Sequence, residues 1–572
     1  MNACQLPANT HEVFNQATPF ENINLYTCDP ALQEAVRREG GGAASACLAA
    51  LGERLGSAEL MALAQLANVH GPQLQQFDRS GRRIDEVTFH PAWHGLMEVL
   101  VKAGLHAAPW VAPAAGAGTG TGTGTHVARA AAYILVGQLE NGVQCPLTMT
   151  FASVPVLRQA TGLPQIMQRW LPKILSSEYD PRSLPVEHKR GALIGMGMTE
   201  KQGGTDVRSN TTCAEALPLD QAQALFGAEA NKVHRIVGHK WFFSVPQSDA
   251  HLILAQDAGG AGLSCFFLPR YLPDGSRNAI RVQRLKDKLG NRSNASAEVE
   301  FAGAYGWLLG AAGRGIATII DMASHTRLDC VLGSAGIMRA ALSQALHHAR
   351  QRMAFGKVLA EQPLMQNVLA DLALESEAAT VFAMRLARCF DEKDDQGQAA
   401  LARVLTPAGK YWICKRGPGF GAEAMEVLGG IGYVEEAPLA RLYRELPVNS
   451  IWEGSGNVMC LDVLRALARS PAARVALAAE LALGGDADAT FVACRARLLQ
   501  TLEQGDADEF DARKLAERIV LAVQAALLLR HAPACVSSAF VATRLAQAPG
   551  GAYGRLPAGT DCAAILARAL HE

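Results

Sequence analysis

The sequence predicts an α+β protein that is mainly helical, with a β-rich middle part between two helical parts and a helical extension at the end. Three observations lead to this fold class. At 572 residues the chain is too long for one ordinary hydrophobic core, so roughly two to four domains are expected. The spacing of apolar residues changes from a helical to a strand-like period near residue 190. The helical period returns at Gly313 and continues to Gly356, which predicts a very long amphipathic helix.

The composition describes a globular protein and does not by itself indicate nucleic acid as a partner. Hydrophobic residues make up 49% of the chain and the formal net charge is -1. The thirteen cysteines are far apart, with Cys28 and Cys47 the closest pair, so neither a metal site nor a redox pair is expected. Reduced thiols and the lack of a leader or of a membrane-length apolar run favour a cytoplasmic protein that does not enter a membrane.

Residues 1–185 are expected to form an N-terminal helical domain. Apolar residues recur at helical spacing from Leu51 to Leu66, and Asn68–Pro72 ends that helix. Residues 113–125 are a Gly/Thr/Ala repeat with too little apolar surface to favour order, so we expect a flexible surface loop between two helices. The repeat lacks the Lys-Ser/Thr ending of a phosphate loop and is assigned no chemistry.

Residues 186–305 are expected to form a middle β-domain. Short alternating segments there are broken by Gly, Pro, Asn and Asp, and the last of them is Ala297–Phe301. The segment Ile236–Ser244 has two apolar residues before Gly238 and three aromatic residues after it. This order predicts a β-hairpin that turns at the glycine.

Residues 306–470 are expected to form an antiparallel helical bundle. After the long first helix, further helices are expected at Pro363–Asp391 and at residues 399–417, with short loops between them. Residues 471–572 continue as an Ala- and Leu-rich helical extension. Its expected breaks are at Gly484–Gly485, Pro533 and Pro549–Gly551.

One turn of the middle part is suited to bind a planar heterocycle. Gly203 and Gly204 interrupt the chain, so the hydroxyls of Thr199 and Thr205 and several free backbone N–H groups gather there. Farther along, three aromatic residues offer ring faces and Ser244 offers a hydroxyl. The alternative, which the pattern alone favours, is a plain β-hairpin with an aromatic core.

The segment Met198–Asp206, followed by Trp241–Ser244, resembles the acyl-CoA dehydrogenase superfamily. Within it, phrases such as Leu285–Ser293 are similar to the flavoproteins of the bacterial adaptive response to DNA alkylation, and the resemblance runs from Thr10 to about Ala468. It implies that the middle domain covers one face of FAD. The residues expected at the cofactor are Met196, Met198, Thr199, Gly203, Gly204, Thr205, Trp241, Phe242, Phe243 and Ser244.

Two further turns match the superfamily, Arg352–Gly356 and Gly429–Tyr433. An arginine fork binds diphosphate oxygens bidentately, and glycines let backbone N–H groups approach an anion. The resemblance implies that Arg352, Phe355, Gly429, Gly430 and Gly432 hold the FAD diphosphate across a subunit boundary. A homo-oligomer is therefore expected, and in this superfamily a tetramer. The alternative is an ordinary surface cation beside a glycine turn.

The segment Ile451–Asn457 resembles the part of acyl-CoA dehydrogenases that carries the general base, and Glu453 lies at the base's position. A carboxylate there would remove the proton alpha to a thioester while the beta hydride passes to the flavin. The alternative is a glutamate favoured near a helix start. By the same resemblance Arg465 lies at the active-site mouth, and the neighbours expected at the cofactor are Ile451, Trp452, Gly454, Ser455 and Asn457.

In the subfamily the C-terminal region binds double-stranded DNA, but the charge of this extension does not favour it. Residues 471–572 contain ten Arg and Lys against eleven Asp and Glu, so no net positive field attracts phosphate. A local basic face remains possible by sequence, and the alternative is a solvated helix face that makes subunit contacts. The candidate DNA contacts are Arg495, Arg497, Arg513, Lys514 and Arg518.

Three functions remain open from the sequence. The first is an FAD protein that binds duplex DNA and protects it from, or deactivates, alkylating agents, with weak acyl-CoA dehydrogenase activity. The second is an acyl-CoA dehydrogenase for a branched or bulky acyl-CoA that does not bind DNA. The third is a structural DNA-binding scaffold with a vestigial flavin. The length of the resemblance favours the first, and the charge of the extension keeps the second.

Overall fold

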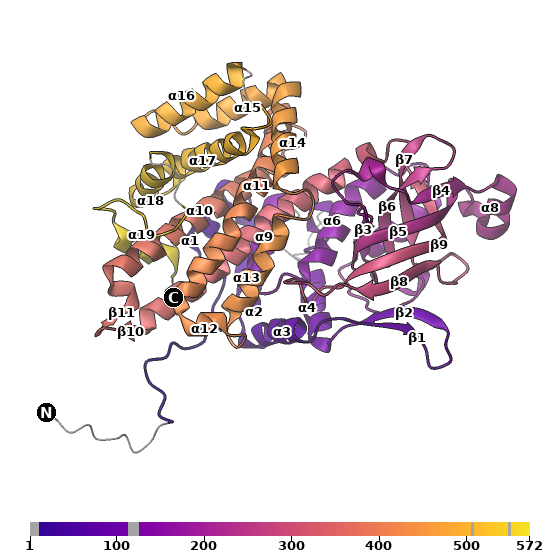
Figure 1. The fold of residues 1–572 in the computed structure, drawn as a ribbon, viewed down its shortest axis with the longest axis horizontal. Coiled ribbons are helices and arrows are strands. Elements are labelled where there is room, and N and C mark those ends of the chain that lie inside the picture. Colours follow the sequence, from indigo (N-terminus) through magenta and orange to yellow (C-terminus); the bar gives the residue numbers. More distant parts are fainter. Residues whose placement is uncertain (1–10, 112–124, 505–507, 547–550, 572) are drawn as a thin grey trace.

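The computed structural model describes residues 11–111, 125–504, 508–546 and 551–571. A β-domain lies on one side of the molecule and a bundle of long helices on the other, with the last helices stacked above the bundle (Figure 1). Within the described residues, no helix combines the length and apolar character needed to cross a membrane. The Gly/Thr/Ala repeat lies outside the described residues except for Thr125, whose hydroxyl caps the helix that follows it.

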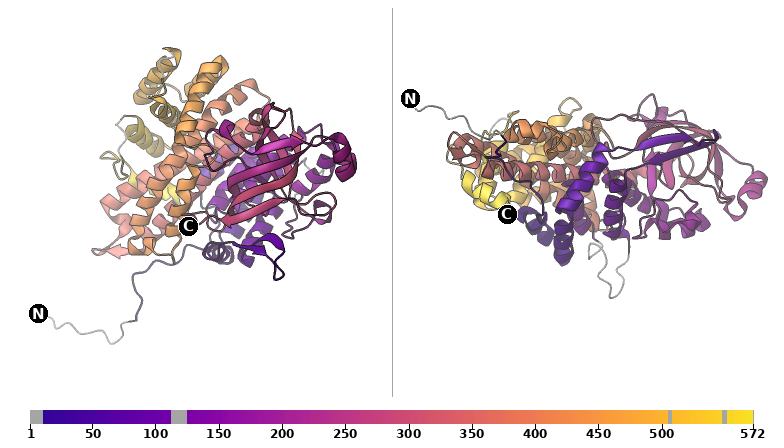
Figure 2. Two further views of the ribbon diagram at one scale, coloured as in Figure 1. Left: turned by 45° about the vertical axis from the view of Figure 1, so that its right-hand side comes forward. Right: turned by 90° about the horizontal axis from the view of Figure 1, so that it is seen from below.

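Within its described residues, the N-terminal region contains seven α-helices and one hairpin, and the hairpin was not expected from the sequence. The helices are α1 (Pro30–Arg38), α2 (Ser45–Leu55), α3 (Ala58–Val69), α4 (Pro91–Lys102), α5 (His126–Gly137), α6 (Gln144–Arg158) and α7 (Pro164–Ile174). The hairpin consists of β1 (Gln73–Phe77) and β2 (Arg83–Thr88). It reaches under the β-domain, where the Gln76 amide donates to the Val282 carbonyl oxygen at 2.9 Å (Figure 2).

The β-domain is a mixed seven-stranded sheet in which the long strands β5 and β9 pair antiparallel along most of their length. Its strands are β3 (Ile194–Gly197), β4 (Cys213–Ala216), β5 (Val233–Ser244), β6 (Ala250–Asp257), β7 (Gly262–Pro269), β8 (Ile280–Leu285) and β9 (Ser296–Leu309). The short helix α8 (Leu219–Phe226) is inserted between β4 and β5. One face of the sheet packs on α6 and α7.

The predicted hairpin at Ile236–Ser244 is wrong, because this segment is part of one continuous strand, β5. Gly238 has φ +150° and pairs with Phe301 of β9 inside the strand, next to a register shift between Ile236 and Val237. A Cβ at this position would overlap with Thr212 of the chain beside it. The glycine is therefore needed for close backbone approach.

The bundle confirms the expected long helices. It contains α9 (Gly315–Gln351), α10 (Pro363–Asp391), α11 (Gln396–Leu428), α13 (Pro438–Asn449) and α14 (Gly456–Arg469). Its tip carries the two-residue strands β10 (Met353–Ala354) and β11 (Lys357–Val358) and the one-turn helix α12 (Gly430–Tyr433). Helix α10 has the predicted limits, and Pro363 occupies its first turn, where no backbone N–H is needed.

The extension is part of the bundle and not a separate body. It comprises α15 (Pro471–Ala482), α16 (Ala489–Gln504), α17 (Ala512–His531), α18 (Ala534–Phe540) and α19 (Cys562–Ala569). Its buried apolar residues share one hydrophobic core with α9, α10, α11 and the N-terminal helices. Arg568 also pairs with Glu34 at 2.5 Å and Glu377 at 2.9 Å. Removing the extension would therefore expose the core of the bundle.

A buried carboxyl group joins the three regions. Glu445 of α13 accepts a hydrogen bond from the Asn291 backbone N–H at 2.7 Å, and its second oxygen has no hydrogen-bond partner among the described residues. Glu140, from the segment after α5, lies nearby and accepts from Ser293 at 2.7 Å. Burial, and next the charge of Glu140, raise the pKa of Glu445 to about 7.

This raised pKa predicts a specific pH dependence of stability. Below pH 4.5, the pKa of this carboxyl in the unfolded chain, its burial does not reduce the free energy of unfolding. As the pH rises from there through about 7, its pKa in the folded protein, the free energy of unfolding falls. Glu445→Gln removes this loss, which amounts to about 3 kcal/mol. We expect the melting temperature of the variant to gain about 2 to 3 °C on wild type between pH 4.5 and 7.5 in thermal scans. A constant difference across this range, as expected for the exposed control Glu436→Gln, would contradict the assignment.

Candidate active site

The candidate base lies in a tight turn between α13 and α14. Glu453 has φ +58° and Gly454 has φ +109°, so two successive residues adopt left-handed conformations. A non-glycine residue reaches this region only when its surroundings hold it there. The turn is held through its carbonyl oxygens. Lys410 donates to those of Trp452, at 2.7 Å, and Gly454, and Arg327 donates to that of Glu453 at 3.1 Å.

Helix α9 fixes the carboxylate itself. The Thr326 hydroxyl lies 2.6 Å from Glu453 Oε2, and Thr326 is buried. Its neighbour Arg327 also pairs with Asp462 of α14 at 3.0 Å. Two consecutive residues of one helix therefore set both the direction of the carboxylate and the position of its backbone. An ordered carboxylate near a dry, apolar surface is what proton abstraction from carbon requires.

The turn faces the surface of the β-domain that contains Met196, Met198, Thr199 and Ser244, which we call the wall. Trp452 packs on the same hydrophobic cluster as the half-buried Met196 and Met198 of the wall. Cys145 of α6 is a buried member of the same cluster. Burial raises the pKa of this thiol to about 12, so it stays protonated. The residue before the candidate base therefore shares one apolar cluster with the two methionines of the β-domain.

Charged groups support the wall from behind. Lys240 donates to Glu200 at 2.8 Å, and both side chains are fully buried. Glu200 also accepts from the backbone N–H groups of Thr211 and Thr212. This pair fixes the segment that contains Thr199 against β5, where the backbone N–H of Trp241 donates to the Thr199 carbonyl oxygen at 2.9 Å.

Not every predicted wall residue faces the same way. Phe243 is fully buried and stacks on His251 with ring centroids 4.1 Å apart, so its ring has no free face for a cofactor. Phe242 points outward, and Trp241 is half-buried under the Lys286 ammonium, 3.4 Å from its ring centroid. Among the turn residues, Met198 and Thr199 are half-buried, whereas the exposed ones are Gly203, Gly204 and Thr205.

The predicted diphosphate turns lie at β10, β11 and α12, at the end of the bundle away from α14 (Figure 1). Phe355 is 100% exposed there and Tyr433 is 79% exposed. Gly429 and Gly430 are exposed beside them, whereas Gly432 is buried. The Arg352 guanidinium donates to the carbonyl oxygen of Asn15 in the N-terminal segment. Within one chain, the structure does not bring these residues to the wall or to the base.

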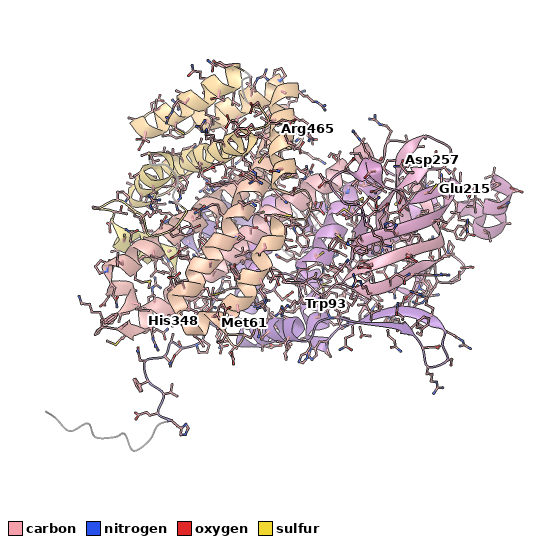
Figure 3. All side chains as sticks on the ribbon, viewed as in Figure 1. Met61, Trp93, Glu215, Asp257, His348 and Arg465 are labelled. Carbon is pink, nitrogen blue, oxygen red and sulfur yellow. The ribbon has the colours of Figure 1, made fainter. Side chains whose placement is uncertain are left out.

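The remaining residues of the catalytic segment form its rim. Ile451, Ser455 and Asn457 are exposed, and Asn457 accepts from Arg513 of α17 at 2.8 Å. Arg465 is exposed on α14, at the end of the bundle opposite Met61 and His348 (Figure 3). It lies 3.8 Å from Asp462, which also pairs with Arg403 at 2.6 Å.

The five candidate DNA contacts do not form one face. Arg513 is engaged by Asn457, beside the catalytic turn. Arg495 is mostly buried and bound to Asp486 at 2.5 Å. Arg497 of α16 and Arg518 of α17 are exposed. Lys514 is exposed, 3.7 Å from Asp511.

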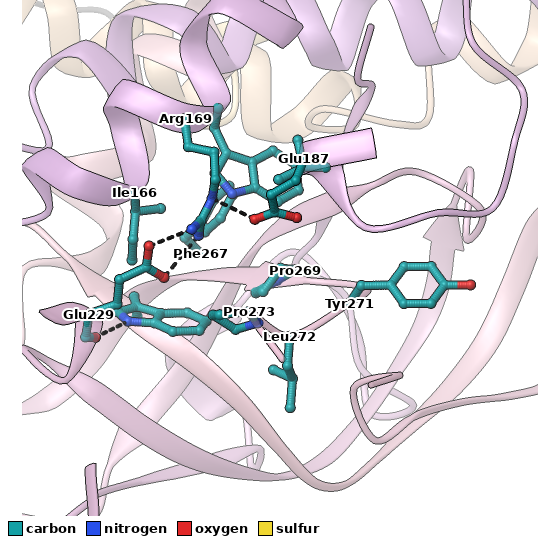
Figure 4. A pocket seen from close by; sticks show the side chains of 12 residues that line it. Ile166, Arg169, Glu187, Glu229, Phe267, Pro269, Tyr271, Leu272 and Pro273 are labelled. Atoms are coloured by element: carbon teal, nitrogen blue, oxygen red, sulfur yellow. Dashed lines mark hydrogen bonds and ion pairs between the residues drawn. The ribbon is translucent and has the colours of Figure 1, made fainter. Parts of the chain in front are cut away.

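Two other hollows are separate from this site. Figure 4 shows a cavity of about 10 Å³ beside α7, where Arg169 bridges Glu187 at 3.0 Å and Glu229 at 2.6 Å. It has room for about one water molecule and serves as a structural junction. A larger hollow of about 410 Å³ lies between the N-terminal segment, α3, α9 and α13, and Glu453 does not line it.

The residues that hold the candidate base are not among those that the sequence predicts. Thr326 and Arg327 lie more than one hundred residues before Glu453, and Lys410 lies in another helix, so no local motif joins them. A weak signal exists for Lys410, which interrupts the apolar neighbourhood of Ala408, Tyr411 and Ile413 in its helix. A charged residue at a position expected in the core is uncommon and indicates a special role.

The residues of the wall and of the facing turn fit a flavin. The indole N–H of Trp452 is buried with no hydrogen-bond partner among the described residues, so it remains available to a bound group. The hydroxyls of Thr199 and Ser244 lie on half-buried residues of the wall. A Cβ at Gly204 would overlap with the Thr199 hydroxyl, so only glycine leaves that hydroxyl in place. FAD bound here supplies a hydride acceptor.

Comparison with known proteins agrees with this geometry. Residues 15–181 match the N-terminal domain of the adaptive response protein AidB, residues 195–304 the middle domain of acyl-CoA dehydrogenases, and residues 313–468 their C-terminal domain. The chain is 57% identical to AidB of Escherichia coli K12 over 458 residues, which cover 80% of each chain.

Two solved structures extend the likeness over the last helices. Bd2924 in its apo form has a TM-score of 0.79 and 29% identity, and covers 91% of this chain and 100% of its own. ACDH-11 of Caenorhabditis elegans, in complex with C11-CoA, has a TM-score of 0.81 and 24% identity over 99% of this chain and 93% of its own. The second likeness is one of fold. The chain therefore belongs to the acyl-CoA dehydrogenase family, in the group of AidB, and is an FAD-dependent oxidoreductase.

Proposed function

We propose that Glu453 is the general base of an acyl-CoA dehydrogenase reaction on an acyl thioester. The alpha proton moves to the carboxylate, a double bond forms between the alpha and beta carbons, and the beta hydrogen leaves as a hydride that FAD accepts when bound. The observation that supports this proposal is the carboxylate at 2.6 Å from Thr326, in a turn pinned against the wall. Such positioning contributes more than carboxylate strength alone.

Replacing the base with its amide provides the test. Glu453→Gln keeps the shape of the side chain but cannot accept the proton, so we expect bleaching of bound FAD by isovaleryl-CoA to slow by about 10² to 10⁴-fold. Anaerobic stopped-flow absorbance measures the rate, and the visible spectrum checks that FAD is retained. The exposed control Glu426→Gln keeps the wild-type rate. Equal bleaching by Glu453→Gln rejects the base assignment, and a wild type that no acyl-CoA bleaches rejects dehydrogenase chemistry.

The cofactor site is completed by a second subunit in this proposal. Arg352 and the Gly429–Tyr433 turn lie far from Glu453, and the exposed Phe355 and Tyr433 offer apolar surface at the same tip. Exposed aromatic side chains of this kind are typical of an interaction surface. A homo-oligomer, with a tetramer as the expected form, would place this tip on the FAD diphosphate of a neighbouring chain.

We further propose that the protein binds double-stranded DNA in the cytoplasm during the adaptive response to alkylation, where it protects DNA or deactivates alkylating agents. The support is the 57% identity to E. coli AidB and the match to the adaptive-response domain family. The exposed cations Arg497, Lys514 and Arg518 are the candidate contacts that remain available. The alternative is an acyl-CoA dehydrogenase without DNA binding, favoured by the near-neutral extension and by the same overall fold in ACDH-11.

A charge-removal series in the full chain separates these two functions. Because the extension shares the core, point variants are used instead of a truncation. Arg497, Lys514 and Arg518 changed together to Gln should weaken duplex binding and lower the log–log salt slope by roughly 0.9 for each phosphate that is no longer neutralised. Fluorescence anisotropy with a labelled duplex measures both quantities.

The matched control changes Arg79, Arg82 and Arg281, three exposed arginines of the β1–β2 turn and the β-domain. This control removes the same amount of charge and should retain the wild-type affinity. Loss of binding in both triple variants would mean that the DNA-binding surface lies elsewhere. Absence of duplex binding by the wild type at low salt would leave the acyl-CoA dehydrogenase without DNA binding as the better account.

A further inference from the structure

A lysine ammonium is buried beneath the catalytic turn without a carboxylate partner. Lys410 of α11 has 0% exposure, and no carboxylate of the described chain lies within ion-pair distance of its Nζ. It donates to the carbonyl oxygens of Trp452 and Gly454. A charge in such a place is unfavourable unless strong hydrogen bonds stabilise it. Its presence indicates that these two bonds do more than fill space.

The two bonds enclose the candidate base. Trp452 and Gly454 are the residues on either side of Glu453, and Arg327 takes the carbonyl oxygen of Glu453 itself. Three successive carbonyl oxygens therefore accept from cationic side chains, at the point where Glu453 and Gly454 have positive φ. Backbone in this region persists only where its surroundings determine it.

Helix α11 also supports the far end of the same turn. The ring of Tyr411, the residue after Lys410, lies against Gly456, where an added Cβ would come within 3.3 Å of the ring. Two consecutive residues of α11 therefore contact the turn on both sides of Glu453. Neither residue is adjacent to the candidate catalytic segment in sequence, and α11 reaches it through these contacts, through its packing on α14 and through the Arg403–Asp462 ion pair.

We propose that Lys410 is the positioning residue of the catalytic turn: its ammonium closes the turn over Glu453 and holds the carboxylate in reach of Thr326. The inference rests on the proposed role of Glu453 as base. A cation suits this task better than a neutral donor, because one ammonium serves two carbonyl oxygens and still has a third proton. Without it the turn is free to relax to unstrained backbone, which moves the carboxylate.

Three variants of the full, FAD-loaded chain test the proposal. Lys410→Met keeps the length of the side chain and removes all three donors, and Lys410→Gln retains a neutral donor. Lys415→Met makes the same change at an exposed lysine of the same helix and serves as the matched control. Should Lys410→Met fold poorly, Lys410→Gln carries the test, since its amide is easier to accommodate in a polar pocket.

The first measurement is amide hydrogen exchange of the peptide that spans residues 450–456, which does not depend on turnover. Exchange there should be at least about tenfold faster in both Lys410 variants, and unchanged in Lys415→Met. The second is FAD bleaching by isovaleryl-CoA. The rate at saturating thioester should fall by about tenfold or more, while the half-saturating concentration stays within about twofold, because positioning acts on the chemical step.

The two hypotheses fail separately. Unchanged exchange at residues 450–456 in Lys410→Met overturns the positioning role of Lys410, whatever the base. An increase in half-saturating concentration with an unchanged saturating rate also overturns it, since Lys410 would then act on thioester binding. Wild-type bleaching by Glu453→Gln, together with faster exchange in the Lys410 variants, overturns the base assignment and leaves Lys410 as the residue that holds the turn.

Discussion

The buried ion pair between Arg129 and Asp329 fixes the position of α9, on which the candidate site depends. Both of its hydrogen bonds are 2.7 Å long, and Thr148 of α6 donates a third to the same carboxylate at 2.8 Å. Removing one partner would leave a buried charge unpaired, at a cost of about 3 to 5 kcal/mol. Thr326 and Arg327 lie within one turn of Asp329, so this pair also sets how far they reach toward Glu453.

The same constraint explains why small residues line the contact between α5 and α9. Gly137 and Gly336 approach each other so closely that a Cβ on Gly336 would come within 2.6 Å of the Ile134 carbonyl oxygen. The two helices therefore pack at one short distance and in one register, and a bulkier side chain would separate them. A rigid α9 suits a site in which a carboxylate must stay within a fraction of an ångström of its position.

Much of the fold could be predicted from the sequence, because the helical spacing of apolar residues can be read from each segment alone. Pro363–Asp391 agrees with α10 for this reason. The sequence predicts a turn at Gly238, because a glycine that breaks an apolar run gives the same sequence pattern in a turn and in a strand that passes close to Thr212. Only the neighbouring chain distinguishes the two cases.

The site was predictable where family motifs are contiguous, and less so where contacts cross the chain. Trp241, Phe242 and Phe243 were assigned together, although successive strand residues alternate in direction, and the structure places Phe243 in the core. Lys410 and Thr326 are not predicted from the sequence, because only helix packing brings them to the turn of Glu453. The sequence predicts Arg513 as a candidate DNA contact, whereas in the structure its bond to Asn457 joins the extension to the candidate catalytic segment.

In the proposed assembly each FAD site is divided, with the wall and the base from one chain and the diphosphate turns from another. Native mass spectrometry of the purified protein tests it most directly, because it reports FAD content and subunit number for the same particle. The account predicts one FAD per chain in the oligomer, most simply four in a tetramer, and loss of FAD from any monomer released by gentle activation. A monomer that retains FAD would contradict it.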